Sequence, residues 1–238
     1  MNGVSCVMPT TSRFDIMPLI INSYNEQTFH PRELIIVHND EQSLPYSLVA
    51  QVGGDVKIIS FSKRMMAAKA RNIGIKESRY HYVAKCDDDD WYFPGRLELM
   101  VKTMDANSSL LGVAYGLMSS FDIVSYHYGF IDKPNWYFDG SIMSRKDVLL
   151  AALKKTEGSG INPCPFKWLK DNIFRNDISK IARLRDLSHL LVLFHGENDS
   201  ISWEYATGEG TEEDFVSRFP SKVVDFVNSI YIKRKDLR

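Results

Sequence analysis

The sequence predicts an α/β fold with a mostly parallel, Rossmann-like central sheet flanked by helices. Two observations carry this prediction. Short apolar runs alternate with helical patterns over the first hundred residues, which is the order typical of a parallel sheet with helical crossovers. The run Leu34–Val37 is apolar without a break, as expected of a strand buried on both faces.

The first half is predicted to hold four strands and three helices. The strands are short apolar-leaning runs at residues 4–8, 33–38, 55–61 and 82–86. Pro9 is expected to end the first of them. The helices cover residues 14–25 and 66–78, and a third follows Pro94. Pro18 and Pro94 suit the first turn of a helix, where a missing N–H is tolerated.

The second half is predicted to mix strands and helices less regularly. The strands fall at residues 111–120, 123–131, 180–184 and 190–194. The helices fall at residues 145–155, 165–175 and 211–231, and the last of these restarts at Pro220. Residues 196–210 are polar and are expected to form a loop. We expect one domain over residues 1–205, in a larger half (1–107) and a smaller half (108–205), and a C-terminal helical extension at 206–238.

Composition excludes several classes of protein. The formal net charge is −1 over 238 residues, so no global field attracts nucleic acid or an anionic membrane. Three widely spaced cysteines do not form a disulfide framework. No signal-peptide pattern opens the chain, and no apolar stretch approaches the ~20 residues that span a bilayer. A cytoplasmic protein is expected, with a peripheral contact at the inner face of the membrane left open.

Four consecutive carboxylates, Asp87–Asp90, follow the predicted strand at residues 82–86. Ligands of parallel α/β sheets bind at the carboxyl ends of strands, which is where this run lies. Adjacent carboxylates repel one another, so the run is costly unless a cation binds there. A divalent metal that carries a phosphorylated ligand is the simplest candidate, and an acidic surface turn is the alternative.

Five segments, in one order along the chain, together resemble the family 2 glycosyltransferases with the GT-A fold. They are Val7–Arg13, Leu34–Asp40, Ala70–Ile75, Asp87–Asp90 with Pro94, and Leu191–His195 with Ser200–Ser202. The resemblance implies that residues 1–107 bind a nucleotide-sugar donor. It also implies that residues 108–205 bind the acceptor and carry the catalytic groups.

The resemblance implies a donor and metal site around the aspartate run. Asp89 is the expected ligand of Mn²⁺ or Mg²⁺, helped by Asp87 and His195, because hard cations prefer oxygen ligands. Asp87 is also expected to meet the ribose or the sugar, with Asp88 and Asp90 orienting the other carboxylates. A polar loop after His195 is expected to close over the donor.

The same resemblance places the nucleotide. Its expected contacts are Pro9, Thr10, Thr11, Arg13, Asn39, Asp40, Arg71, Asp87 and Asp88. Asn39 stands where the family usually has an acid that reads the nucleobase, so uracil is only the default base. Arg71 offers a planar fork of donors suited to phosphate or base contacts.

An inverting transfer needs a carboxylate that removes the proton of the acceptor hydroxyl. Asp171 is the expected base, and Asp139, among aromatic residues, is the competitor. The expected acceptor is a glycan, a lipid-linked oligosaccharide or another hydroxyl compound, with no clear nucleic-acid binding. Two alternatives stay open. One is a nucleotidyltransferase, which would need a Gly-rich loop after the first strand, where this chain has Pro9–Ser12. The other is a catalytically degenerate sugar-binding or scaffolding relative.

Overall fold

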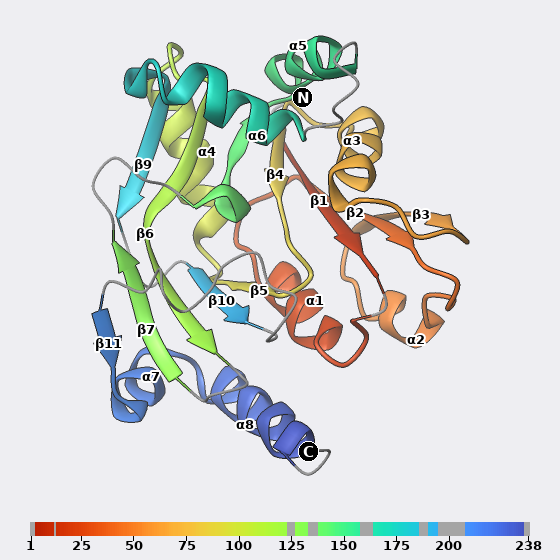
Figure 1. Ribbon diagram of the computed structural model, residues 1–238, viewed down its shortest axis with the longest axis vertical. Helices are drawn as coiled ribbons and strands as arrows, with labels where there is room; N and C mark the ends of the chain where they lie inside the picture. The colour runs from red at the N-terminus through yellow and green to blue at the C-terminus, as the bar shows by residue number, and fades with distance from the viewer. Residues whose placement is uncertain are drawn as a thin grey trace.

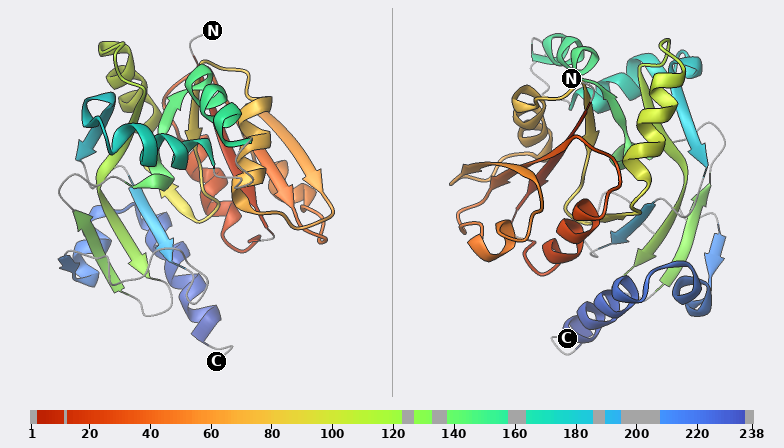
Figure 2. Two further views of the ribbon diagram at one scale, coloured as in Figure 1. Left: turned by 45° about the horizontal axis from the view of Figure 1, so that its top comes forward. Right: turned by 180° about the vertical axis from the view of Figure 1, so that it is seen from behind.

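The computed structural model describes residues 3–11, 13–122, 127–132, 138–157, 164–185, 190–194 and 208–235. Within these residues an 11-stranded sheet runs through the molecule, and helices pack on both of its faces (Figures 1 and 2). The α/β fold with a mostly parallel, helix-flanked sheet is therefore confirmed.

Four parallel strands form the first half of the sheet. They are β1 (Val4–Thr10), β2 (Arg32–Asn39), β3 (Asp55–Phe61) and β4 (Tyr82–Lys85). Their spatial order is β4-β1-β2-β3, and β3 ends the sheet in the described part of the chain. This order places the carboxyl ends of β1 and β4 side by side.

The second half adds the 11-residue strand β6 and six shorter strands, most of which pair in antiparallel orientation. They are β5 (Asp90–Tyr92), β6 (Gly112–Asp122), β7 (His127–Asp132), β8 (Met143–Arg145), β9 (Ile181–Arg185), β10 (Leu190–Phe194) and β11 (Gly208–Gly210). The strand β8 joins the two halves because it pairs with β4 on one side and β6 on the other. β11 lies in a segment that we expected to be a loop; its Gly-Glu-Gly sequence carries no apolar pattern, and it is a strand through its pairing with β7.

All the helices except the four-residue α2, which was not predicted, follow the predicted order. The helices are α1 (Met17–Asn25), α2 (Tyr46–Val49), α3 (Ala67–Glu77), α4 (Arg96–Ala106), α5 (Lys146–Glu157), α6 (Pro165–Leu169), α7 (Glu212–Arg218) and α8 (Ser221–Lys235). A π-helical turn, η2 (Lys170–Phe174), continues α6, and short 3₁₀ turns η1 (Asp139–Ser141) and η3 (Ile178–Lys180) lie elsewhere. Pro18 lies in the first turn of α1, as predicted.

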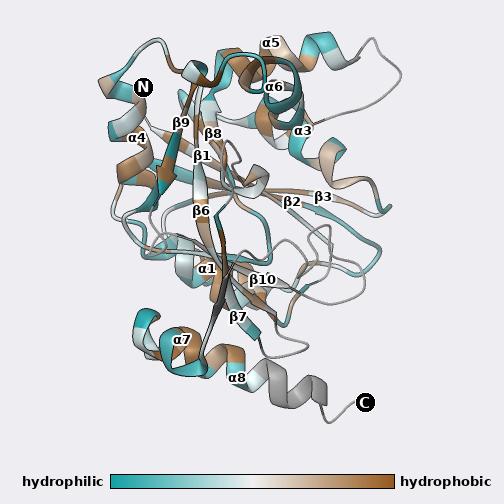
Figure 3. Cartoon of the chain, turned by 60° about the vertical axis from the view of Figure 1, so that its left-hand side comes forward, coloured by the Kyte–Doolittle hydropathy of each residue, from teal (hydrophilic) through white to brown (hydrophobic). Residues whose placement is uncertain are grey.

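The core lies on both faces of the sheet because successive side chains of a strand point to opposite sides. Met8 and Ile36 belong to the cluster that α1 and α4 cover, whereas Val7 and Val37 belong to the cluster that α3 and α5 cover. Figure 3 shows both hydrophobic (brown) and hydrophilic (teal) residues on helices such as α4 and α7.

We expected the first strand to end at Pro9, but it continues to Thr10. The N–H of Cys86, which follows β4, donates to the carbonyl of Val7, so the backbone polar groups of Val7 face β4. The backbone nitrogen of Pro9, two residues further along the strand, faces the same side. The pairing of β1 with β4 ends at Val7, while the pairing with β2 continues to Thr10. Pro9 is tolerated because its missing N–H points away from β2.

Three further properties bear on the sequence expectations. The three cysteines are free and buried. In the described residues, none of the helices has the length and apolar content that crossing a bilayer requires. Phe215 and Phe219 of α7 and the following turn pack into the core. The division into 1–205 and an extension at 206–238 stays a prediction.

Candidate functional site

The candidate site lies at the carboxyl ends of β1, β2 and β4. Thr10 is paired with His38, and Cys86 donates its N–H to the carbonyl of Val7. The chain leaves β4 directly into the aspartate run and then enters β5. The predicted donor loops, far apart in the sequence, therefore meet at one edge of the sheet (Figure 1).

Arg13, in the loop after β1, joins two of the four aspartates. Its Nη1 lies 3.2 Å from Asp88 Oδ1 and also contacts Asp89 Oδ2. The Asp89 side chain keeps 20% of its surface exposed and that of Asp88 10%. The structure thus brings together three of the predicted donor-site residues, and Asp89 is the more accessible of the two acids.

Asp87 lies between two cations. Arg71 Nη2 of α3 is 2.5 Å from Asp87 Oδ1, and Lys85 Nζ is 3.9 Å from Asp87 Oδ2. Lys85 is buried, although it ends a strand whose other residues are apolar or aromatic. Sequence reasoning singled out Arg71 but passed over Lys85; a lysine inside an apolar strand was the signal that could have found it.

The last aspartate differs from the first three. Asp90 is 1% exposed, and burial, followed by the charges of Asp89 and Asp87, raises its pKa well above the ordinary value. The hydroxyl of Tyr92 donates to Asp90 Oδ2 at 3.1 Å. Burial also raises the pKa of Asp88, which the Arg13 guanidinium partly offsets. The raised pKa values of Asp88 and Asp90, and the pairing of Asp87, Asp88 and Asp89 with cations, both lower the repulsion among the four adjacent carboxyls.

The end of β2 supplies a fixed amide. Asn39 is 1% exposed, and its Oδ1 accepts the N–H of Met65 at 3.1 Å. This bond orients the amide so that its Nδ2 is the remaining donor, and no contact described here satisfies that donor. Burial lowers the pKa of the neighbouring His38. Asp40 Oδ1 caps the next turn by accepting the N–H of Glu41 at 2.7 Å.

The predicted catalytic acids have different surroundings. The backbone of Asp139 belongs to η1, whose Gly140 lies so near the aspartate run that an added Cβ would be 3.0 Å from Asp87 Oδ2. Asp171, in η2, pairs with two cations on its own helix surface, Lys167 at 2.5 Å and Arg175 at 3.3 Å. The structure therefore brings the Asp139 turn to the aspartate run and gives Asp171 partners of its own.

The remaining predictions concern Pro9, Thr11, His195 and Ser200–Ser202. Pro9 lies within β1, and Thr11 directly follows that strand. His195 and Ser200–Ser202 lie outside the described residues, together with the loop that was expected to close over the donor. Their roles stay predictions.

The chemistry of the site suits a hard divalent cation. Within the described ranges, no three carboxylate, imidazole or thiolate groups converge into a ready-made metal site. Mg²⁺ and similar ions are usually held by one or two carboxylates together with substrate phosphates. The partly exposed side chain of Asp89, paired with Arg13, and the neighbouring pair of Asp87 with Arg71 fit that kind of shared site.

The chain matches the model of the family described as "Glycosyl transferase family 2" over residues 5–175. Among curated relatives, "Uncharacterized glycosyltransferase YwdF" of Bacillus subtilis is 30% identical over 102 residues, covering 43% of this chain and 38% of the relative. An "Uncharacterized glycosyltransferase" of Haemophilus influenzae is 28% identical over 149 residues, covering 62% of this chain and 48% of the relative. The chain thus spans less than half the length of these relatives.

Solved structures show the same fold. S. aureus TarS 1-349 in complex with UDP-GlcNAc aligns with a TM-score of 0.59 and 14% identity, over 85% of this chain and 62% of that chain. The mannosyltransferase PcManGT from Pyrobaculum calidifontis, in complex with GDP-Man and Mn²⁺, aligns with a TM-score of 0.57 and 12% identity, over 83% of this chain and 58% of that chain. These similarities confirm the GT-A fold.

Proposed function

The chain belongs to glycosyltransferase family 2, and on that premise we propose that it transfers a sugar from a nucleotide-diphosphate donor to an acceptor hydroxyl. The carrying observation is the set of paired charges at the ends of β1 and β4: Asp87 with Arg71, and Asp88 and Asp89 with Arg13. A diphosphate leaving group needs both a metal ligand and fixed cations, and this edge of the sheet offers both.

Each residue of this set has a distinct part in the proposal. Asp89 would hold Mn²⁺ or Mg²⁺, which neutralises the negative charge that develops on the departing diphosphate. Arg13 and Arg71 add guanidinium donors, whose planar forks suit phosphate oxygens. Asp87, held by Arg71 and Lys85, would accept hydrogen bonds from the ribose or the sugar.

The nucleobase is proposed to lie near the ends of β1 and β2, with uracil as the default. The complexes of one structural neighbour with UDP and UDP-GlcNAc support this choice. The second neighbour, in complex with GDP-Man, leaves guanine as the alternative. The buried amide nitrogen of Asn39 has no hydrogen-bond partner among the described residues, and we propose that a base carbonyl accepts a hydrogen bond from it.

We propose an inverting reaction, in which a carboxylate removes the proton of the acceptor hydroxyl as that oxygen attacks the sugar. The position of η1 beside Asp87 supports Asp139 as this base. Asp171, the stronger candidate from sequence, is neutralised by Lys167 and Arg175. The proposed acceptor is a glycan or a lipid-linked oligosaccharide, as the sequence resemblance implies.

The test is the release of nucleoside diphosphate from a nucleotide-sugar in the presence of Mn²⁺. UDP-GlcNAc and GDP-Man are the first donors to assay. We expect Asp89→Ala to lower the rate at least about 100-fold, because loss of a metal ligand removes several kcal/mol of transition-state stabilisation and each ~1.4 kcal/mol is tenfold.

A matched control is Asp147→Ala, since Asp147 also pairs with an arginine, Arg145 at 3.5 Å, but lies on α5. This variant should keep the wild-type rate. Equal rates for Asp89→Ala and Asp147→Ala would contradict the proposal. Binding of UDP-GlcNAc without any release, with all acceptors tried, would instead favour the sugar-binding relative that lacks catalysis.

A further inference from the structure

Arg96, the first residue of α4, is a buried cation that the proposed mechanism does not use. The residue is 1% exposed. No carboxylate pairs with its guanidinium among the described residues, and its polar contacts are two backbone carbonyls and a thiol. A buried charge without a counterion is costly, so this arginine needs an explanation other than core packing.

The contacts of Arg96 join two segments of the candidate site. Its Nη2 donates to the carbonyl of Lys85 at 2.8 Å and to the carbonyl of Ser141 at 3.3 Å. Its Nη1 contacts Cys86 Sγ at 3.6 Å. Lys85 and Cys86 directly precede the aspartate run, and Ser141 ends the η1 turn that begins at Asp139.

A second set of contacts extends from Arg96 to the aspartates themselves. The guanidinium carbon lies 3.8 Å from the centroid of the Tyr92 ring. The hydroxyl of Tyr92 accepts the N–H of Asp87 at 3.3 Å and donates to Asp90 Oδ2 at 3.1 Å. Arg96 thus supports the ring that fixes both ends of the aspartate run.

The η1 turn is held from its other side as well. Ser141 Oγ accepts the N–H of Tyr115 in β6 at 2.9 Å and donates to the carbonyl of Phe138 at 2.8 Å. The missing side chain of Gly140 lets this turn approach Asp87. The aspartate run and η1 therefore touch at the site and are joined beneath it by one guanidinium.

We infer that Arg96 is a positioning residue that sets the aspartate run and the Asp139 turn relative to each other. The inference rests on the proposed function, since it takes the aspartate run as the donor half of the site and η1 as part of the acceptor half. Both carbonyls accept from one nitrogen, Nη2, so the three N–H groups of a lysine ammonium could serve them. A lysine lacks the second nitrogen that contacts Cys86 and the planar group that lies over the Tyr92 ring. A methionine would fill the space without donating.

Hydrogen exchange tests this role without any substrate. The reporters are the amides of Asp87 and Tyr115, because their acceptors are the side chains of Tyr92 and Ser141. We expect Arg96→Met to speed exchange in segments 82–92 and 112–116 by about tenfold or more relative to β2, which opens only with the whole domain. Arg96→Lys should give an intermediate effect and provides the test if the methionine variant does not fold.

Leu97→Ala is the matched control, since Leu97 is the next residue of α4 and is also fully buried. It should lower stability and raise exchange in all segments together. The inference is overturned if Arg96→Met and Arg96→Lys change exchange in the same uniform way as Leu97→Ala.

A second measurement distinguishes a failure of this inference from a failure of the proposed donor. UDP with Mn²⁺ should bind Arg96→Lys within about threefold of wild type, while turnover of UDP-GlcNAc falls by roughly 10- to 100-fold, as expected when reacting groups are misplaced by an ångström or less. If the wild-type chain neither binds UDP nor turns over UDP-GlcNAc, that donor is wrong, and the exchange data still decide the role of Arg96. Loss of binding and turnover in equal proportion would contradict a positioning role.

Discussion

Asp90 differs from the other three acids of the aspartate run because it is almost completely buried. The sequence presents four equal acids, but burial raises the pKa of Asp90, whereas Arg71 and Lys85 pair with Asp87. Asp89 has the most exposed side chain of the three acids that pair with cations, and its Oδ2 contacts Arg13. We propose Asp89 as the ligand for a cation, which is the role that the family resemblance implies for it.

His38 makes stability depend on pH in a direction that follows from its burial. Because burial lowers its pKa in the folded chain, the unfolded chain takes up a proton first as the pH falls below the ordinary value of about 6.5. The stability that the neutral ring contributes is complete above that value and is lost as the pH falls toward the lowered pKa.

We expect the free energy of unfolding of His38→Gln to fall less between pH 7.5 and pH 5 than that of the wild type. The measurement is the free energy of unfolding in urea at several pH values, without metal. The difference between wild type and variant should shift in favour of the variant as the pH falls. Parallel curves for the two proteins would show that His38 does not contribute this dependence.

The sequence could predict the place of the site but not its internal pairing. Asp87–Asp90 were located because a buried strand precedes them. Lys85 and Arg96 were missed because a basic residue at the end of a strand or the start of a helix usually faces water. Their burial depends on tertiary contacts with Asp87, Ser141 and Tyr92.

At the scale of elements, the packing of α3 on β1 depends on Gly74. A Cβ at this position would lie 2.4 Å from Val7 Cγ1, closer than atoms approach in a folded protein. Since α3 carries Arg71 and β1 leads to Arg13, this contact also sets the spacing of the two cations that hold the aspartates.

We expect Gly74→Ala to lower the free energy of unfolding by about 1–3 kcal/mol, the usual cost of overpacking a tight contact. Lys76→Ala, an exposed position of the same helix, should change it by less than about 0.5 kcal/mol. Urea denaturation measures both. Addition of Val7→Ala should relieve part of the cost, so that the two changes are less than additive; strict additivity would show that the two residues do not clash.

Most elements were predictable because their apolar residues repeat at the period of a helix or strand. The strands β5 and β8 and the helix α2 were not predicted, because each has only three or four residues and shows no periodic pattern. β1 continues through Pro9 because only one of its neighbours still pairs there. β11 escaped prediction because its three residues, Gly208–Gly210, form a strand only through the partner that β7 offers.

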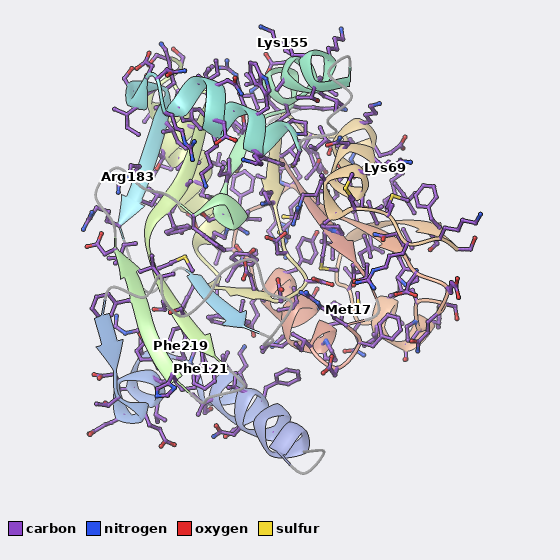
Figure 4. All side chains as sticks on the ribbon, viewed as in Figure 1. Met17, Lys69, Phe121, Lys155, Arg183 and Phe219 are labelled. Atoms are coloured by element: carbon purple, nitrogen blue, oxygen red, sulfur yellow. The ribbon has the colours of Figure 1, made fainter. Side chains whose placement is uncertain are left out.

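At the scale of the whole molecule, aromatic side chains tie the C-terminal segment to the sheet. Phe215 of α7 lies 4.6 Å from the ring centroid of Phe121 in β6 and 5.7 Å from that of Tyr128 in β7. Phe121 and Phe219 of this group are labelled in Figure 4. Lys222 of α8 also pairs with Glu26, which follows α1. Residues after 206 therefore contribute to the core that supports the site.

This packing predicts a large effect from one side chain of α7. We expect Phe215→Ala to lower the free energy of unfolding by about 3–5 kcal/mol, since it empties a fully buried aromatic position. Val216→Ala, at the next and exposed position, should cost less than about 0.5 kcal/mol. Thermal and urea melts of the full chain give both values. A small loss for Phe215→Ala would mean that α7 is only loosely attached.

At the opposite end of the sheet, β3 has most of its residues exposed, including Ile58 and Phe61. A strand that ends a sheet leaves a row of backbone N–H and C=O groups open to another strand. Charged side chains on an edge strand disfavour pairing with another strand. Lys57, which pairs with Glu77, lies in the middle of β3. The protein thus carries its own protection against edge-to-edge aggregation, on the outer strand of the half of the sheet that forms the candidate site.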